Sequence, residues 1–272
     1  MRSMRVMIAA SAAILTFSAG TTSVSSAPAW APAATAAIRP GVPVRTEVGQ
    51  CTSNFVFAEG DAVYLGTAAH CAGLSGSLAA SGCDTESLPL GSPVRVNGAS
   101  RPGRLAYSSW LTMQEVGETD PDVCFFNDLA LIRLDPADAR RVNPSVPHWG
   151  GPVGLSPGTR AGQSVYSYGN STLRLGLAAI SPMKGISLGD GAGGWTHDVL
   201  TITPGLPGDS GSGFLDSQGR ALGQLSTLAL LPLPGANGVG DLRRALAYMH
   251  AHTDVDAVLV PGTEPFNGNR LL

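Results

Sequence analysis

Short apolar runs separated by turn-forming residues dominate the sequence between residues 49 and 240. The chain has 35 glycines and 20 prolines among its 272 residues. Runs rich in strand-forming residues recur at 54–57, 62–65, 93–96, 129–134, 164–168, 199–202 and 221–225. Glycine and proline interrupt helices and favour turns, so this spacing is typical of many short strands. The sequence therefore predicts an all-β domain, either a sandwich or a barrel.

One segment near the C-terminal end departs from this pattern. Leu242, Leu246 and Met249 are spaced i, i+4 and i+7, which places them on one face of a helix. Asp241 precedes them at the position of a helix N-cap. We expect a helix over about 241–252 that packs on the outside of the domain, with His250 facing solvent.

The first 29 residues have the order of a secretory signal peptide. Two arginines lie within residues 1–5, residues 6–17 are mostly apolar, and small residues follow to residue 29. The apolar stretch is shorter than the roughly 20 residues that span a bilayer. Ala27 and Ala29 favour cleavage before Trp30. We expect a secreted protein that leaves the membrane, and the alternative is an uncleaved anchor. Residues 30–48 then form a linker or short pro-segment before a domain at 49–272.

The four cysteines of the chain are an even number in a protein expected to be exported. This count predicts two disulfide bonds, which four cysteines can form in three pairings. The spacing contains no CxxC pair and no HxxxH pair, so we predict no metal site. The net charge of −3 and the absence of a basic cluster argue against a nucleic-acid partner.

Three short motifs contain residue types that can do chemistry. Residues 67–71 read TAAHC, residues 127–134 read NDLALIRL, and residues 207–213 read PGDSGSG. Each motif alone also fits a structural role, because glycine, serine and aspartate are common in turns. Together they place His70, Asp128 and Ser210 in the chain order of the chymotrypsin type of catalytic triad.

With these motifs the chain resembles the chymotrypsin/trypsin-like serine proteases, and most closely the secreted bacterial members. The resemblance extends from about residue 49 to residue 252. It implies two six-stranded antiparallel β-barrels packed face to face, followed by the C-terminal helix. The first barrel would cover about 49–142 and the second about 159–240, with a Pro/Gly-rich boundary at 143–158. The active site would lie in the cleft between the barrels.

The resemblance also implies a role for each motif residue. Ser210 would attack the substrate carbonyl, because a serine hydroxyl becomes nucleophilic when a base removes its proton. His70 would be that base, and Asp128 would orient and stabilise its ring. The backbone N–H groups of Gly208 and Ser210 would form the oxyanion hole. This mechanism needs no cofactor.

In the resembled family, the cysteine after the catalytic histidine is bridged to one on the preceding strand. The resemblance therefore implies a disulfide between Cys51 and Cys71. It leaves Cys83 to pair with Cys124, and two free thiols are the alternative for these last two residues. Leu206 stands where the family commonly has a cysteine near the catalytic serine.

Asp209 is expected to be a buried carboxylate, which requires a positively charged partner. Animal members of the family supply a new N-terminal amine, but the chain contains no Ile-Val-Gly-Gly segment. Some bacterial members supply an arginine from the strand that matches 164–169, and this strand has no arginine. The partner of Asp209 stays open at this point.

Three positions bear on the expected substrate pocket. Pro204 occupies the position six residues before the nucleophile, where an acid selects basic side chains. Ser226 matches the family serine beside the triad, and Leu228 replaces a glycine that leaves the pocket open. These residues predict a preference for small or medium apolar side chains rather than arginine or lysine.

The sequence thus predicts a secreted serine endopeptidase that cleaves polypeptides through an acyl-enzyme. The alternative is a catalytically weak or inactive protease-like binding module, for which Leu228 and the open partner of Asp209 are the grounds. An esterase of another fold requires G-x-S-x-G and the order Ser, Asp, His. Ser212 replaces the last glycine of that motif, and the order differs.

Overall fold

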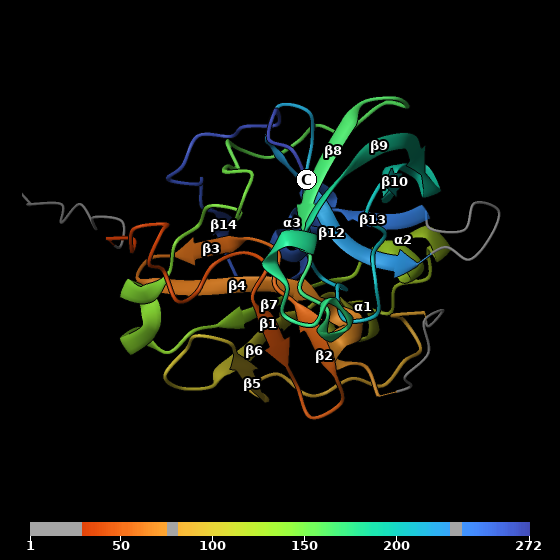
Figure 1. The fold of residues 1–272 in the computed structure, drawn as a ribbon. Coiled ribbons are helices and arrows are strands. Elements are labelled where there is room, and N and C mark those ends of the chain that lie inside the picture. Colours follow the sequence, from red (N-terminus) through yellow and green to blue (C-terminus); the bar gives the residue numbers. More distant parts are fainter. Residues whose placement is uncertain (1–28, 75–80, 229–235) are drawn as a thin grey trace, which may run out of the picture.

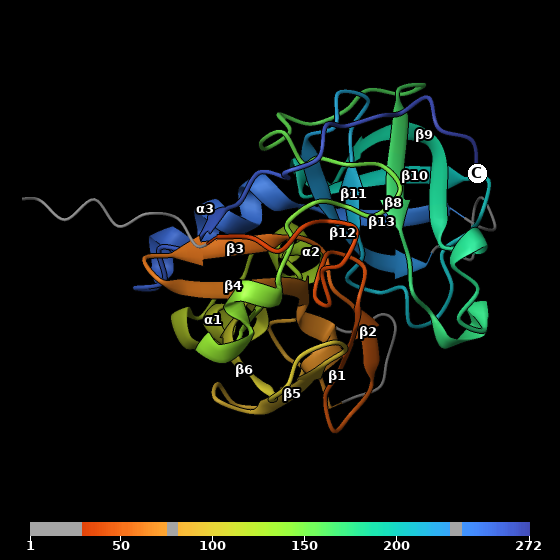
Figure 2. The same ribbon diagram turned by 60° about the vertical axis from the view of Figure 1, so that its left-hand side comes forward.

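The computed structural model describes residues 29–74, 81–228 and 236–272, and it leaves the side chain of Leu228 undescribed. The predicted signal segment lies outside these ranges except for its last residue. Two β-structures are stacked, with the first in the lower half of Figure 1 and the second in the upper half. The chain passes from the first to the second along residues 142–163, as the turned view in Figure 2 also shows, and residues 258–259 later pair with the first again.

The first half is an eight-stranded curled sheet in the order β14-β3-β4-β7-β6-β5-β1-β2. Its paired strands are antiparallel. The strands are β1 (Pro43–Arg45), β2 (Gln50–Thr52), β3 (Val56–Glu59), β4 (Ala62–Ala68), β5 (Pro93–Val96), β6 (Gly103–Ser108), β7 (Leu129–Arg133) and β14 (Val258–Leu259).

The second half is a closed antiparallel barrel in the order β10-β13-β12-β11-β8-β9. Its strands are β8 (Ser164–Tyr168), β9 (Pro182–Gly191), β10 (Thr196–Thr201), β11 (Gly213–Leu215), β12 (Ala221–Leu228) and β13 (Ala236–Asp241). An apolar cluster fills the barrel interior: Val165, Met183, Val199, Phe214, Leu222, Leu225 and Val239. Most of these residues come from the runs that predicted strands.

The helices are short and lie outside the sheets. They are α1 (Ser109–Val116), α2 (Pro121–Phe126) and α3 (Leu242–His252), together with the 3-10 helices η1 (Ala69–Ala72), η2 (Pro136–Arg141), η3 (Thr172–Arg174), η4 (Ala178–Ile180) and η5 (Ala192–Gly194). The predicted C-terminal helix is confirmed, because Asp241 accepts a hydrogen bond from the Arg244 N–H at 2.7 Å and Leu242 and Met249 are fully buried. Within the described ranges, no helix has the length and apolar character needed to cross a bilayer.

A second apolar cluster joins the two halves. Phe55 and Leu129 from the first sheet pack in one cluster with Tyr166 and Leu215 from the barrel and with Leu242 of α3. Burial of side chains from both halves in one cluster holds the halves against each other, because separating them would expose this apolar surface to water.

The predicted all-β architecture is confirmed, but the first half differs from a six-stranded barrel. Strand β1 comes from the segment expected to be a linker, where Ile38 and Val44 are buried, and β14 comes from the C-terminal tail. The Ala/Pro-rich composition of 30–48 hid this strand, since β1 has only three residues and lacks a repeating apolar pattern.

Candidate active site

Adjacent strands of the first sheet bring His70 and Asp128 together. Strand β4 leads into η1, which carries His70, and Asp128 immediately precedes β7. The two strands pair with Ala68 opposite Leu129, so their ends coincide. His70 Nδ1 lies 2.7 Å from Asp128 Oδ2, and the His70 backbone N–H donates to Asp128 Oδ1 at 2.8 Å.

Asp128 holds the imidazole in one tautomer. Because a carboxylate only accepts hydrogen bonds, Nδ1 carries the proton and Nε2 is left as an acceptor. Burial of the ring opposes its protonation, but the charge of Asp128 and its hydrogen bond outweigh burial, and the pKa of His70 is raised. Asp128 is 2% exposed and also accepts a short hydrogen bond from Ser226 Oγ on β12. The barrel thereby supports the carboxylate of the first sheet.

Ser210 lies on a turn of the barrel that is fixed against the first sheet. The Thr52 backbone N–H donates to Ser210 O at 2.8 Å, and Thr52 Oγ1 donates to Gly208 O at 2.8 Å. Thr52 follows Cys51, which is joined to the neighbour of His70 by a disulfide. Among the described residues no hydrogen bond joins Ser210 to His70, a contact that in many enzymes tightens only when substrate binds.

The peptide groups before Gly208 and Ser210 are held in fixed orientations. Pro207 O accepts a hydrogen bond from Ser171 Oγ at 2.5 Å, and Asp209 O accepts one from the Ser212 N–H at 2.9 Å. In a trans peptide the N–H points opposite to the C=O. The N–H groups of Gly208 and Ser210 therefore point away from these partners, and neither has an acceptor within the described parts of the chain.

Glycine is required at position 208 by the backbone conformation. Its φ is +96°, a region that residues with a Cβ rarely adopt. An added Cβ would also lie 3.4 Å from Ser171 Cα. The close approach of Ser171 and the orientation of the Pro207–Gly208 peptide thus depend on the same glycine.

Arg174 is the partner of Asp209 that the sequence left open. Its Nη2 lies 2.6 Å from Asp209 Oδ2, and its Nε lies 3.2 Å from both carboxylate oxygens. The Ser171 N–H donates to Oδ1 at 2.8 Å and the Leu206 N–H donates to Oδ2 at 2.9 Å. The arginine comes from η3, which follows the strand on which the resemblance implies such a partner.

The expected substrate pocket is described in part. Pro204 is exposed, and its carbonyl accepts a hydrogen bond from Arg174 Nη2 at 3.1 Å. Behind it, the buried carboxamide of Asn237 packs on Gly205, where an added Cβ would lie 2.6 Å from Asn237 Oδ1. Asn237 pairs with Leu228, whose side chain lies outside the described residues. No sequence motif surrounds Asn237 on β13, so local sequence gives no signal for its position behind Gly205.

Two disulfides are present, and they join the residues that the resemblance pairs. Cys51 is bonded to Cys71 with a Cα–Cα distance of 6.1 Å, and Cys83 is bonded to Cys124 with a distance of 5.2 Å. The side chains of Cys51, His70 and Cys71 approach within 4.8 Å of one another. Since both sulfurs belong to a disulfide, they offer no thiolate to a metal ion.

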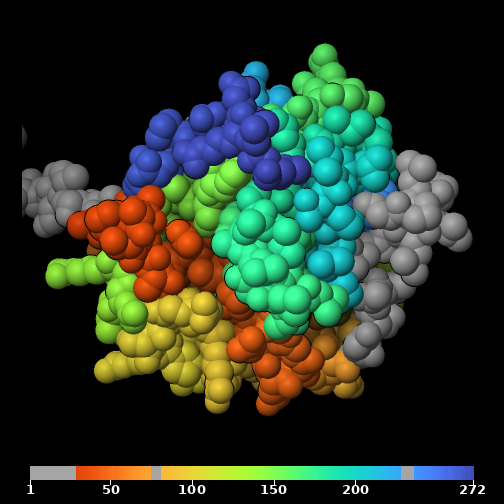
Figure 3. Space-filling model, viewed as in Figure 1, coloured from red at the N-terminus to blue at the C-terminus, as the bar shows by residue number. Residues whose placement is uncertain are grey.

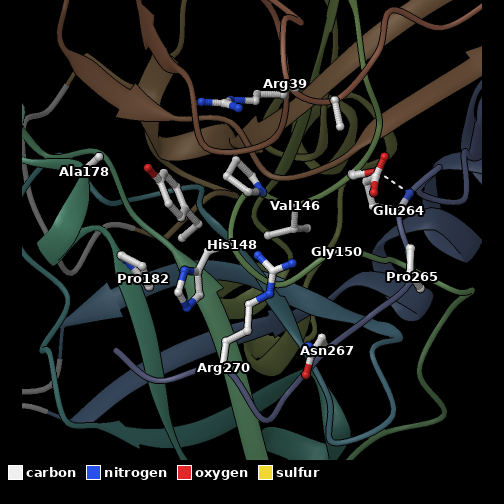
Figure 4. Close-up of a pocket in the computed structure, with 15 residues that line it drawn as sticks. Arg39, Val146, His148, Gly150, Ala178, Pro182, Glu264, Pro265, Asn267 and Arg270 are labelled. Atoms are coloured by element: carbon white, nitrogen blue, oxygen red, sulfur yellow. Dashed lines mark hydrogen bonds between the residues drawn. The ribbon is translucent and has the colours of Figure 1, made fainter.

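A cavity of about 550 Å³ lies apart from His70, Asp128 and Ser210. It is bordered by the N-terminal arm, the connection between the halves, the β8–β9 region and the C-terminal tail, and Figure 4 shows Arg39, His148 and Arg270 directed toward it. None of the predicted catalytic or pocket residues lines this cavity.

Solved structures of bacterial serine proteases are similar to the chain over most of its length. Thermobifida fusca Protease A has a TM-score of 0.53 and 18% identity, with 83% of this chain and 99% of that chain covered. Cellulomonas bogoriensis chymotrypsin has a TM-score of 0.50 and 16% identity, with coverage of 82% and 98%. A glutamic acid specific serine protease has a TM-score of 0.50 and 17% identity, with coverage of 82% and 100%.

Sequence comparison alone does not find this similarity. No protein-family model matches the chain, and a search of curated protein sequences gives no match. At identities of 16–18% the structural matches establish the architecture. The chain therefore has the fold of the bacterial chymotrypsin-like serine proteases.

Proposed function

We propose that this chain is a secreted bacterial serine endopeptidase that hydrolyses peptide bonds with His70, Asp128 and Ser210. The observation that carries the proposal is the pairing of His70 with Asp128, together with a serine turn that is hydrogen-bonded to Thr52 and whose N–H groups have no acceptor in the described residues. These are the elements that acyl transfer requires: a base, its orienting acid, a nucleophile and oxyanion donors.

The reaction would proceed in two stages. Ser210 Oγ attacks the substrate carbonyl while His70 Nε2 accepts the hydroxyl proton, and the N–H groups of Gly208 and Ser210 stabilise the oxyanion. The C–N bond then breaks, and the leaving amine takes the proton from His70. A water molecule attacks the resulting acyl-enzyme in the same way, which releases the acid and restores Ser210.

The proposed substrate preference is for small or medium apolar residues before the cleaved bond. Pro204 supplies no charge to pair with arginine or lysine, and a buried cation without a partner is unfavourable. The contribution of Leu228 rests on the sequence alone. Asn237 adds a neutral polar group behind Gly205. One methylene changes selectivity by about 1–3 kcal/mol, so we expect a graded preference.

Export is part of the same proposal. It is supported by the order of residues in the first 29 positions and by two disulfides, which persist in oxidising compartments. The alternative of an inactive binding module rested partly on an unidentified charge partner for Asp209. Arg174 is that partner, so this ground for the alternative is removed.

Hydrolysis of short chromogenic peptides by the oxidised, purified protein tests the proposal. The peptides differ only at the residue before the cut. We expect cleavage after alanine, valine or leucine, and near-background rates from Ser210→Ala at unchanged thermal stability. If Ser210→Ala were as active as the wild type, Ser210 would not be the nucleophile. If substrates with arginine or lysine before the cut gave the highest kcat/KM, the proposed apolar preference would be wrong.

A further inference from the structure

The connection between β8 and β9 exposes a run of large apolar side chains. Residues 172–180, which we name the leucine loop, have the sequence TLRLGLAAI. Leu173 is 58% exposed, Leu175 80%, Leu177 55% and Ile180 43%. The loop lies in the middle of the face seen in Figure 3. Large apolar side chains exposed close together in one loop are more typical of a binding site than single exposed leucines are.

The outer surface of the leucine loop has no charge. Its one charged residue, Arg174, is 1% exposed and points inward to Asp209. Segments that bind lipid surfaces usually combine apolar residues with exposed lysine or arginine. An apolar polypeptide segment therefore fits this loop better than a lipid surface does.

Leu175 is not explained by the stability of the fold. Its φ is +53°, in the left-handed region where glycine and asparagine are favoured over leucine. Its side chain is the most exposed of the leucines in the loop, so it buries little apolar area. A strained position that carries an exposed leucine points to a role in binding.

The inner side of the loop contacts the proposed catalytic turn. Arg174 bonds Asp209 and Pro204 O, and its Nη1 donates to Ile180 O, which closes the loop around the guanidinium. Ser171, directly before the loop, donates to Pro207 O. On the other side, Ala178 borders the cavity of Figure 4. The loop thus lies directly beside the turn that carries Ser210.

We propose that the leucine loop is an exosite that binds an apolar segment of the polypeptide substrate, beside the bond that is cleaved. Its continuity with the Ser210 turn identifies the substrate as the occupant. The substrate role rests on the proposed function, whereas the binding of apolar polypeptide by Leu173, Leu175 and Leu177 can be measured without catalysis.

Binding to the Ser210→Ala protein tests the exosite. The probes are two fluorescent 20-residue peptides, one of alternating leucine–serine pairs and one of glutamine and serine, followed by fluorescence anisotropy. We expect the apolar peptide alone to bind. Leu175→Asn combined with Leu177→Ser should weaken its binding at least about tenfold, because two leucines lose contact area. Asparagine suits the left-handed backbone, so the variant should stay folded.

Leu90→Ser is the matched control, since Leu90 is 55% exposed and lies outside the loop. It should leave peptide binding unchanged, and thermal melts verify that each variant is folded. Failure of the apolar peptide to bind, or equal loss in the Leu90→Ser control, would overturn the exosite. Leucine-dependent binding to phosphatidylcholine vesicles without peptide binding would overturn it in favour of a lipid surface.

Wild-type hydrolysis of short peptides separates the two proposals. Leucine-dependent peptide binding without hydrolysis by the wild type would refute the endopeptidase while the exosite stands as a binding site. Hydrolysis by the wild type without leucine-dependent binding would refute the exosite alone.

Discussion

Arg174 and Asp209 form an ion pair in which both side chains are almost completely buried. The two residues lie 35 positions apart, their closest atoms are 2.6 Å apart, and their side chains are 1% and 0% exposed. Two backbone N–H groups complete the hydrogen bonding of the carboxylate. The pair joins the leucine loop to the residue immediately before Ser210, so the proposed catalytic turn and the loop depend on one contact.

Arg174→Met should strongly destabilise the protein. Removing one partner of a buried ion pair leaves the other charge uncompensated, which typically costs about 3–5 kcal/mol. Urea unfolding measures the change. Arg101→Met is the control, because Arg101 is 67% exposed in its pair with Asp135 and such surface pairs contribute about 0–1 kcal/mol. Equal losses in the two variants would contradict a special role for Arg174.

Ser171→Ala should lower kcat more than it changes KM. Without the hydroxyl, Pro207 O loses its hydrogen bond and the Gly208 N–H is no longer held in place. Loss of one oxyanion donor reduces the rate about 10²–10³-fold, which is the upper limit for this variant. Ser171→Thr keeps the hydroxyl and should restore most of kcat. If the role of Ser171 were purely structural, Ser171→Ala would lower the stability of the protein and leave kcat of the folded fraction unaltered.

The activity should rise with pH through a midpoint above the ordinary histidine value of about 6.5. His70 must be neutral to accept a proton, and Asp128 raises its pKa, so protonation abolishes activity from a higher pH downward. Asp128→Asn removes the charge and should shift the midpoint of the residual activity to lower pH. Profiles of kcat/KM from pH 5 to 9 measure both midpoints, and coincident midpoints would contradict the pairing.

His197 should stabilise the fold at acidic and neutral pH and less at alkaline pH. It is 1% exposed, with Nδ1 2.7 Å from Asp190 and Nε2 2.9 Å from Asp241, so both nitrogens must donate. Burial opposes protonation, but the two carboxylates outweigh it and raise the pKa of His197. The stabilisation that His197 provides is complete below its pKa in the unfolded protein, about 6.5. It is lost as the pH rises through its higher pKa in the folded protein.

Unfolding free energies of the wild type and His197→Gln measure this contribution between pH 5.5 and 9. The difference between the two proteins should be largest at the acidic end and should decrease with rising pH. A difference that grows with pH would mean that His197 is neutral in the folded protein.

Local patterns predicted much of the fold. The apolar runs at 129–134 and 164–168 correspond to strands β7 and β8, and Asp241 caps the expected helix. Strands such as β1 and β13 escaped notice because one is very short and the other is rich in small residues. The pairing of these strands depends on neighbouring strands that are distant in the sequence, so local sequence patterns do not predict it.

For the candidate site too, local motifs predicted some residues, and contacts between distant segments determined the others. Motifs singled out His70, Asp128 and Ser210 as candidates, because each occurs among residues whose types the chemistry requires. Arg174 and Ser171 carry no such motif, and their roles arise from a loop that folds back on the Ser210 turn. The one available signal was a single arginine within the apolar run at 172–180.

Covalent labelling of Ser210 tests the central claim most directly, because a fluorophosphonate reacts with a serine only when a base activates it. The oxidised wild-type protein is treated with the probe, digested and analysed by mass spectrometry. The account predicts one modified peptide containing Ser210, no labelling of Ser210→Ala and strongly reduced labelling of His70→Ala. An unlabelled wild type that is folded, or a label on another serine, would contradict it.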